Sequence, residues 1–265
     1  MSSPISYYSS SILTIFRQVK NWYAIPTLLL GQKSLILKLK NGIQLNVRNI
    51  MDVWIVKETC LDRDYEVNGT PLKDGWTIID IGSGIGEFAI LTATELPNCQ
   101  VFAYEPFPES FTLLQENLQL NQTNNVHAFQ MGVSSHAEKL TLATIGAAVQ
   151  HTTTASTVSG TASSFLEVEG ISFETLFEAN GIDHCHFLKI DCEGCEFELL
   201  LKARADTLSK IDHICLEYHD NFTEFTHQAL VTHLQEHNFQ IKLTPNPVHH
   251  YLGFLYAYRD ENVKL

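Results

Sequence analysis

The sequence predicts an α/β fold built on a single doubly wound, mostly parallel sheet of about seven strands, as in Rossmann-like enzymes. Three observations support this fold class. Strand-like apolar runs alternate with helical patterns from Ile78 to the C-terminus. A glycine-rich turn joins the first run to a helix, and several runs end in an acidic residue. The chain has 265 residues, 45% of them hydrophobic, and residues 74–265 show no second domain boundary.

Residues 1–73 are expected to form an N-terminal extension made of a helix and a β-hairpin. Residues 1–11 carry no charge and indicate a loose terminus, and apolar residues at helical spacing predict an amphipathic helix from Ile12 until Pro26 ends it. Alternating aliphatic residues on both sides of Asn41-Gly42 predict a hairpin over 34–48. We expect the helix to pack against the main domain, with substrate capping or membrane-surface contact as alternatives. The acids of 51–73 are expected to be solvated.

The stretch Ile78–Phe88 predicts a strand, a tight turn and the start of a helix. Its glycines follow the pattern G-x-G-x-G, one residue shorter than the dinucleotide fingerprint. Asp80 adds a carboxylate that would repel a pyrophosphate but suits a cationic or amino-bearing ligand. S-adenosylmethionine has both a sulfonium and an amine. The predicted ligand-binding residues of this stretch are Asp80, Gly82, Ser83, Gly84 and Gly86.

The next unit supports a nucleotide-like ligand. Val101–Tyr104 predicts a strand that ends at Glu105, 19 residues after Gly86. This is close to the ~20-residue spacing at which an acid reaches a ribose in nucleotide-binding units. A helix is expected over 109–120 and a third strand over 126–133, with Gly132 near its end.

Residues 138–177 interrupt the alternation. Strands are expected at Lys139–Ala143 and Phe165–Phe173. The Ser/Thr/Ala/Gly-rich segment 146–164 between them predicts a flexible insertion. A lid over the site and a tolerated surface insertion both stay open.

Further acids end the later strands. A strand over 187–190 ends at Asp191, and a strand over 211–218 places Glu217 and His219 at the same rim. Because ligands bind outside the carboxyl ends of parallel strands, Asp80, Glu105 and Asp191 should face one cleft. His219, which titrates near neutrality, is a candidate general base, and Asp191 and Glu193 are alternatives. With Glu217 these groups offer ligands for a divalent metal, although no metal site is assigned. A helix over 225–237 and two strands over 239–243 and 252–258 complete the chain, and these strands could pair as an antiparallel hairpin.

Composition limits the partners and the compartment. The chain has 17 basic and 30 acidic residues, and the net charge of −13 argues against nucleic acid or anionic membrane as a partner through bulk electrostatics. The apolar run at Ile25–Leu30 is too short to span a membrane. Six cysteines without a visible secretory signal predict reduced thiols and a cytoplasmic location. Cys192 and Cys195 form a C-x-x-C pair, which we expect to serve packing.

On these residues the chain resembles class I S-adenosylmethionine-dependent methyltransferases, and among them the FkbM family. The matching pieces are Asp80–Gly86, Tyr104-Glu105-Pro106 and Leu188–Glu196, within a resemblance over about 34–259. The resemblance implies that Asp80 and the glycines hold the methionine portion of the cofactor, with Asp191 nearby, that Glu105 binds the ribose and that Gly132 lies near the adenine. It implies O-methylation of a hydroxyl on a small molecule or sugar. Cys192 and Cys195 depart from the family pattern, which has small or aliphatic residues there.

Two other functional classes stay open. A nicotinamide-dependent oxidoreductase shares the same alternation of strands and helices, but the glycine spacing disfavours it. A non-catalytic module that binds S-adenosylmethionine would keep the fold without turnover. The acceptor, metal dependence and oligomeric state, including a homodimer, are not defined by the sequence.

Overall fold

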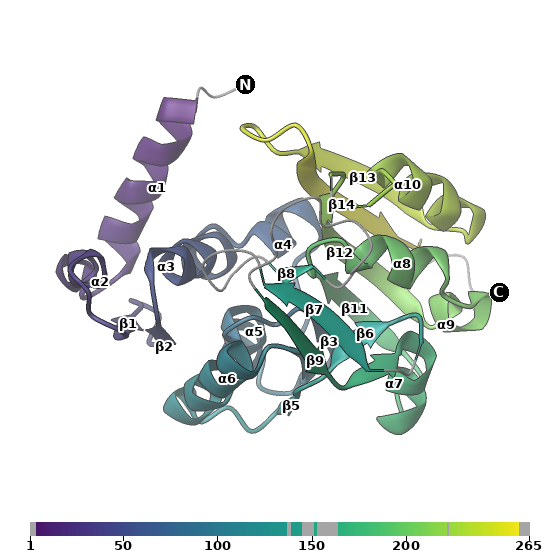
Figure 1. Ribbon diagram of the computed structural model, residues 1–265, viewed down its shortest axis with the longest axis horizontal. Coiled ribbons are helices and arrows are strands. Elements are labelled where there is room, and N and C mark those ends of the chain that lie inside the picture. The colour runs from purple at the N-terminus through teal and green to yellow at the C-terminus, as the bar shows by residue number, and fades with distance from the viewer. Residues whose placement is uncertain (1–3, 137–138, 145–150, 153–163, 222, 260–265) are drawn as a thin grey trace.

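A computed structural model describes residues 4–136, 139–144, 151–152, 164–221 and 223–259. At its centre is a seven-stranded sheet in the order β13-β14-β12-β11-β3-β4-β5 (Figure 1). Strands β12, β11, β3, β4 and β5 are parallel, whereas β14 runs antiparallel to β12 and β13. The strands span Thr77–Ile81 (β3), Gln100–Tyr104 (β4), Val126–Phe129 (β5), Cys185–Ile190 (β11), Ile211–His219 (β12), Gln240–Pro245 (β13) and Leu252–Tyr258 (β14). The predicted doubly wound sheet and its closing hairpin are confirmed.

The sheet has a hydrophobic core on each face. Ile78 of β3 packs in one core with Phe187 of β11, while the next residue, Ile79, packs in the other core with Leu188. Successive side chains of a strand point to opposite faces, so both faces are apolar here. This explains why the strands are nearly continuous apolar runs in the sequence.

Helices cover both faces. One core includes residues of α4 (Asp64–Asn68), α5 (Glu87–Glu95) and α6 (Pro108–Asn121). The other includes residues of α7 (Phe173–Ala179), α8 (Cys195–Leu201), α9 (Ala205–Ser209) and α10 (His227–Glu236). The helices α5, α6 and α10 were expected from periodicity, while α7 replaces the end of a predicted strand. It begins there because the Ser172 side chain accepts a hydrogen bond from the amide of Thr175, which caps the helix.

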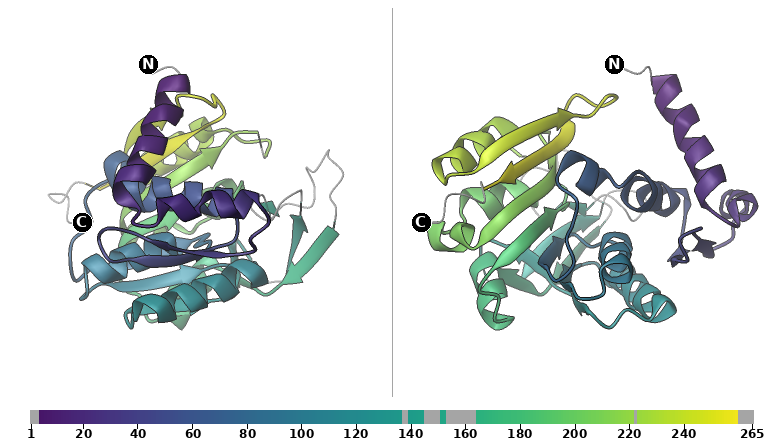
Figure 2. Two further views of the ribbon diagram at one scale, coloured as in Figure 1. Left: turned by 90° about the vertical axis from the view of Figure 1, so that its left-hand side faces the viewer. Right: turned by 180° about the vertical axis from the view of Figure 1, so that it is seen from behind.

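The N-terminal extension forms one edge of the molecule, with α1 (Pro4–Gln18) and α2 (Pro26–Leu29) outermost (Figures 1 and 2). The predicted hairpin is confirmed as β1 (Leu35–Lys38) and β2 (Gln44–Val47), which pair antiparallel. The predicted helix is corrected at both ends. It begins at Pro4, within the stretch expected to be loose, and ends at Gln18 because Val19 forms a β-bridge with Leu39. Pro26 opens α2 rather than ending a long helix.

The extension packs on the main domain through a core of its own. Leu37, Leu45 and Val53 lie in one cluster with Ile90 of α5 and Leu113 of α6. Between the hairpin and β3, the extension contains α3 (Ile50–Val56), the π-helix η2 (Lys57–Asp62) and α4. The short 3₁₀-helix η1 (Trp22–Ala24) lies between α1 and α2.

The sequence predicted that the acids of residues 51–73 are solvated, but not all of them are. Asp52 is buried and forms an ion pair with Arg48 at 3.0 Å. The buried position is possible because the guanidinium supplies a matching charge and two side-chain hydrogen bonds.

The predicted third strand is divided. Its first part is β5, which pairs with β4, whereas β6 (Gly132–Ser134) pairs with β10 (Gly170–Ser172) outside the main sheet. A Cβ at Gly132 would lie 2.5 Å from Leu140, so glycine allows β6 to approach the insertion closely. The insertion contains a three-stranded sheet of β7 (Leu140–Thr144), β8 (His151–Thr152) and β9 (Ser164–Val168). Apart from β8 and Ser164, the segment 146–164 lies outside the described residues, and so does the prediction of its flexibility.

Candidate active site

The chain turns to opposite sides of the sheet after β3 and after β11, and the residues that follow these two strands meet. The amide of Asp191 donates to the carbonyl of Ile81 at 2.9 Å. Gly82 has a φ of +75°, and a Cβ there would lie 1.8 Å from the carbonyl oxygen of Asp191. Only glycine permits this contact between the two loops. Such a switch point is where open α/β sheets bind ligands.

A cavity lies over this point, and three parts of the chain line it. The N-terminal extension contributes Arg48, Asp52 and Ile55. The glycine turn and α5 contribute Gly82, Gly84, Ile85 and Glu87, and the segments after β4 and β11 together with β7 contribute Glu105, Phe107, Leu142, Asp191, Cys192 and Glu193. The extension therefore lines part of the site, although through Arg48, Asp52 and Ile55 and not through the N-terminal helix for which substrate capping was an alternative.

Glu105 connects the glycine turn to the end of β4. Its carboxylate accepts hydrogen bonds from the amide of Gly84 at 2.9 Å and from the amide of Phe107 at 2.8 Å. Burial raises the pKa of Glu105 to about 7, although these two hydrogen bonds oppose the shift. The acid that the sequence placed at a ribose thus lies in the cavity wall beside the glycine turn.

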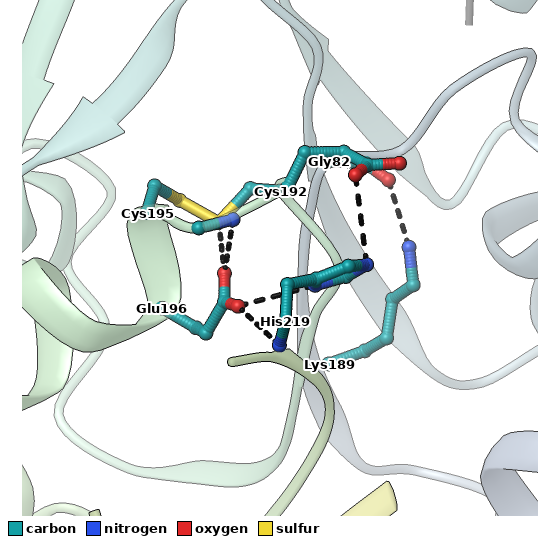
Figure 3. The surroundings of a disulfide bond; sticks show 8 residues. Gly82, Lys189, Cys192, Cys195, Glu196 and His219 are labelled. Atoms are coloured by element: carbon teal, nitrogen blue, oxygen red, sulfur yellow. Dashed lines mark hydrogen bonds and ion pairs between the residues drawn. A yellow bond between two sulfur atoms is a disulfide. The ribbon is translucent and has the colours of Figure 1, made fainter. Parts of the chain in front are cut away.

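Asp80 lies behind the turn rather than in the cavity. It is 0% exposed, it faces Lys189 across β3 and β11, and its Oδ1 is 3.0 Å from the Lys189 Nζ. Lys189 also donates to the carbonyl of Gly82 at 2.8 Å (Figure 3). Burial raises the pKa of Asp80 and Lys189 lowers it. The direct contact predicted between Asp80 and an amino-bearing ligand is replaced by an ion pair that fixes the glycine turn. A lysine within an apolar strand was the signal for it.

Glu87, which the sequence reasoning did not assign, opens into the cavity. It is the first residue of α5 and is 3% exposed. Its Oε2 has no hydrogen-bond partner among the described residues. Burial raises the pKa of Glu87 to about 8. A buried, unpartnered carboxylate oxygen facing a cavity indicates a ligand with a donor or a positive charge.

Three other predicted cofactor residues shape the backbone. The hydroxyl of Ser83 donates to the carbonyl of Asp80 at 2.9 Å, and Gly86 is the N-cap of α5. Gly132 packs against Leu140. These residues are not among those that line the described part of the cavity.

Acidic groups gather on the β11 side of the cavity. The Tyr65 hydroxyl donates to Oδ2 of Asp191 at 2.7 Å. Glu193 has a φ of +54°, an uncommon conformation for a residue with a side chain, and lies with its Oε2 3.6 Å from the His219 Nε2. Burial raises the pKa of Glu193 to about 7, against the opposing charge of His219. Burial also raises the pKa of nearby Glu217 to about 8.

His219 differs from the sequence expectation. Its side chain is buried and its Nδ1 lies 3.1 Å from Oε1 of Glu196, which also accepts the His219 amide (Figure 3). Burial lowers the pKa of His219, but the Glu196 hydrogen bond and the charges of Glu196, Glu193 and Glu217 outweigh it and raise the pKa to about 10. The imidazole is therefore protonated at neutral pH, and the expectation that it titrates near neutrality is wrong.

The C-x-x-C pair is also corrected. Cys192 and Cys195 form a disulfide rather than two packed thiols (Figure 3). Glu193 and Gly194 between them both have positive φ, which folds the segment back so that the two Cα atoms are 5.5 Å apart. The other four cysteines are free and buried, as the expectation of reduced thiols predicts for them.

Two groups of side chains in the described residues have the spacing of metal ligands without a competing disulfide. Asp191, Glu217 and His219 each present a ligand atom, all within 4.8 Å of one another, at the rim that the sequence predicted. His184, His186 and Asp212 form a similar group at the other end of β11 and β12. Two carboxylates and one imidazole are a donor set that suits first-row divalent ions.

The sheet order, the glycine turn at the switch point and the acid at the end of β4 define a Rossmann-like class I methyltransferase. The family model of the methyltransferase FkbM domain matches residues 80–241, which is more than half of the chain. The protein belongs to the FkbM methyltransferase family. Membership of this family excludes the nicotinamide-dependent oxidoreductase as the functional class of the protein.

Relatives agree with this assignment. The chain is 25% identical to "Methyltransferase 1" of Beauveria bassiana, over 65% of this chain and 75% of the relative. It is 23% identical to the hexuronic acid methyltransferase AglP of Haloferax volcanii, over 78% of this chain and 84% of the relative. The crystal structure of methyltransferase FkbM from Methylobacillus flagellatus KT matches with a TM-score of 0.50 and 15% identity, over 79% of this chain and 54% of that one. This likeness concerns the fold.

Proposed function

We propose that this protein transfers the methyl group of S-adenosylmethionine to a hydroxyl oxygen of an uncharged small molecule or sugar. The observation that carries the proposal is the cavity at the β3–β11 switch point. There Glu105 and the glycine turn form one wall, and Asp191 and Glu193 form the other. Donor and acceptor would meet between these walls.

The residues of the cavity fit S-adenosylmethionine. Glu105 presents a carboxylate held by two backbone amides, which suits the paired hydroxyls of a ribose. Glu87 has a buried oxygen without a partner in the described residues, which suits the amine of the methionine portion. Gly82 and Gly84 let the backbone approach the ligand closely. When bound, the cofactor supplies a methyl group already activated by the sulfonium, so the protein mainly has to align the acceptor and exclude water.

The charge of the cavity favours an uncharged acceptor. Asp191 and Glu193 line the cavity, and their ionised carboxylates would repel a carboxylate or phosphate on the incoming molecule. The hexuronic acid that AglP is named for offers only oxygen atoms as methyl acceptors, which favours O-methylation here as well. We therefore infer an oxygen as the acceptor atom, on a molecule less acidic than a hexuronic acid.

Glu193 is the general base in this proposal. It lines the cavity, and its pKa of about 7 matches the working range of a base near neutral pH. Asp191 is the second candidate, and the Tyr65 hydroxyl fixes its orientation. His219 acts as a positioning residue, because a protonated imidazole 3.6 Å from Glu193 orients that carboxylate and does not accept a proton.

The test combines binding and turnover. Calorimetry should show binding of S-adenosylmethionine, and Glu105→Gln should weaken it. Mass spectrometry should then detect S-adenosylhomocysteine and a methylated product from a panel of neutral sugars and alcohols, with hexuronic acids as weaker acceptors. Absence of cofactor binding would contradict the proposal. Cofactor binding without product from any acceptor would support the non-catalytic alternative.

A further inference from the structure

The first part of the N-terminal extension, residues 1–51, differs in charge from the rest of the chain. Residues 1–51 contain six basic residues and no aspartate or glutamate, which leaves 11 basic and 30 acidic residues for residues 52–265. The net charge of −13 therefore hides a basic segment attached to a strongly acidic domain. Five of the six basic side chains are exposed, namely Arg17, Lys20, Lys33, Lys38 and Lys40.

The same segment exposes large apolar side chains. Leu29 is 75% exposed and Leu30 is 85% exposed at the end of α2, and Tyr23 is 69% exposed in η1. Ile12 and Phe16, one helical turn apart on α1, are exposed as well. Trp22 stands against Phe16 with ring centroids 4.6 Å apart. We call these apolar residues, with the five basic residues above, the N-terminal surface.

Backbone hydrogen bonds hold the N-terminal surface together. Lys20 donates its amide to the carbonyl of Lys38 at 2.7 Å, and Lys40 donates to Gln18 at 2.9 Å. The Asn21 side chain donates to the carbonyl of Ile36 at 2.8 Å and accepts from the amide of Lys38 at 2.9 Å, and both partners lie in β1. The residues between α1 and η1 thus lie beside β1 and extend the hairpin by a third segment. Their basic and aromatic side chains belong to one rigid unit.

Packing against the main domain, the role expected from the sequence, uses the other side of this unit. Leu37 and Leu39 are buried in the core of the extension, while Ile36 and Lys38 alternate with them and are exposed. Val19 is buried beside Leu39. The apolar and basic residues listed above therefore remain outside the core. The elements that carry them, α1, η1, α2 and the hairpin, lie along one edge of the molecule (Figure 2).

We propose that the N-terminal surface binds the surface of an anionic phospholipid bilayer. Lysine and arginine side chains attract anionic headgroups, aromatic side chains occupy the interface, and leucine side chains enter the acyl boundary. Within the part of the chain that the structure describes, no helix is long and apolar enough to cross a membrane, so the contact is interfacial. The acidic remainder of the chain is repelled by the same bilayer, which orients the protein with the extension toward the lipid.

Vesicle binding tests this proposal with the full chain. We expect cosedimentation with vesicles of equal parts phosphatidylcholine and phosphatidylglycerol, and much weaker binding to phosphatidylcholine alone. Higher ionic strength should release the protein, since the Debye length falls from about 10 Å at 0.1 M to about 3 Å at 1 M. The emission of Trp22 should shift to the blue on binding, and Trp22→Phe should remove that part of the shift.

Two sets of variants separate charge from apolar contact. Joint replacement of Lys33, Lys38 and Lys40 by Gln should weaken binding about 100-fold, because each basic residue near the lipid contributes about one kcal/mol. Leu29→Ser with Leu30→Ser should weaken it about 30-fold or more. Matched controls change exposed residues elsewhere: Lys139, Lys202 and Lys242 to Gln for charge, and Val67 with Phe165 to Ser for apolar area.

Several outcomes would overturn the proposal. Equal binding to both kinds of vesicle would remove the role of charge, and equal losses in the control variants would remove the role of this surface. Absence of vesicle binding would also refute it. In that case a dimer in light scattering that the leucine variants dissociate would assign the surface to a second copy of the chain, and salt-sensitive binding of duplex DNA would assign it to nucleic acid.

Discussion

Nδ1 of His219 lies 3.1 Å from Oε1 of Glu196, and both side chains are shielded from water. Glu196 accepts the His219 amide as well, and its other oxygen accepts the amide of Gly194. This arrangement connects the end of β12 to the turn that contains the disulfide and Glu193. The same contact raises the pKa of His219 to about 10, which favours a positive charge beside the acidic wall of the cavity and supports the positioning role proposed above.

Replacement of His219 by Gln should destabilise the protein in a pH-dependent way. The folded-state pKa of about 10 is above the ordinary value for histidine, so the stabilisation is fully present below pH ~6.5 and is lost as the pH rises to about 10. We expect a difference in the free energy of unfolding of a few kcal/mol at pH 6 that shrinks toward pH 10. Urea unfolding of both proteins across this range measures it. A difference that grows with pH would contradict the assigned charge.

The same substitution should shift the pH dependence of turnover. The His219 charge lowers the pKa of Glu193, which burial raises to about 7. Without that charge the pKa of Glu193 should rise, and the acidic limb of the kcat profile should move to higher pH. Glu193→Gln should remove the limb and lower kcat about 100-fold or more. A limb that stays in Glu193→Gln would transfer the base to Asp191.

The fold was largely predictable because burial on both faces of a parallel sheet imposes a strong pattern. Apolar runs such as Ile78–Ile81 and their terminal acids located the strands of the main sheet, and the glycine turn located the start of α5. The sequence predictions failed where contacts between distant parts of the chain determine the local structure. Residues 4–11 are mostly serine and tyrosine yet helical, and β6 pairs with β10 outside the main sheet. Asp52 is buried by its ion pair with Arg48.

The sequence predicted where the candidate site lies, but it did not predict the protonation of the side chains there or their contacts with one another. Parallel topology placed Glu105 and Asp191 around one cavity, as expected, whereas Asp80, which was expected in the same cleft, is buried behind the glycine turn. The sequence does not reveal that Lys189 occupies the space below Gly82 and engages Asp80. It does not reveal that Glu196 reaches His219, since these residues are 23 positions apart. Both contacts depend on side-chain packing between separate elements.

Glu105 should make cofactor binding pH-dependent. Ribose hydroxyls donate to a carboxylate, and burial raises the pKa of Glu105 to about 7, so protonation below that pH removes acceptor capacity. The Kd for S-adenosylmethionine in wild type should rise as the pH falls below about 7. Glu105→Gln should bind about 10–100-fold more weakly. Its affinity should be nearly flat between pH 5 and 8, as measured by calorimetry, and an unchanged slope would exclude Glu105 as the titrating group.

Variants of Asp191 and of its hydrogen-bond partner Tyr65 should distinguish effects on catalysis from effects on cofactor binding. Asp191→Asn should lower kcat far more than the affinity for the cofactor, because its proposed role concerns the acceptor. Tyr65→Phe removes the 2.7 Å hydrogen bond to Oδ2 while keeping the charge and most of the packing, and should lower kcat by about 10-fold. A double variant should show less than the product of the two effects. Multiplicative effects would mean that Tyr65 does not act through Asp191.

Gly82 sets the contact between the two halves of the site. A Cβ there would lie 1.8 Å from the carbonyl oxygen of Asp191, and the φ of +75° disfavours any side chain. Gly82→Ala should therefore cost more than about 4 kcal/mol or prevent folding, since the main-chain oxygen cannot move without breaking the bond between Asp191 and Ile81. Gly75→Ala is the matched control, because Gly75 has a φ of +85° but open space around it, and it should cost only about 1 kcal/mol. Similar losses in both variants would show that backbone strain alone, and not the approach of β3 to β11, requires glycine at this position.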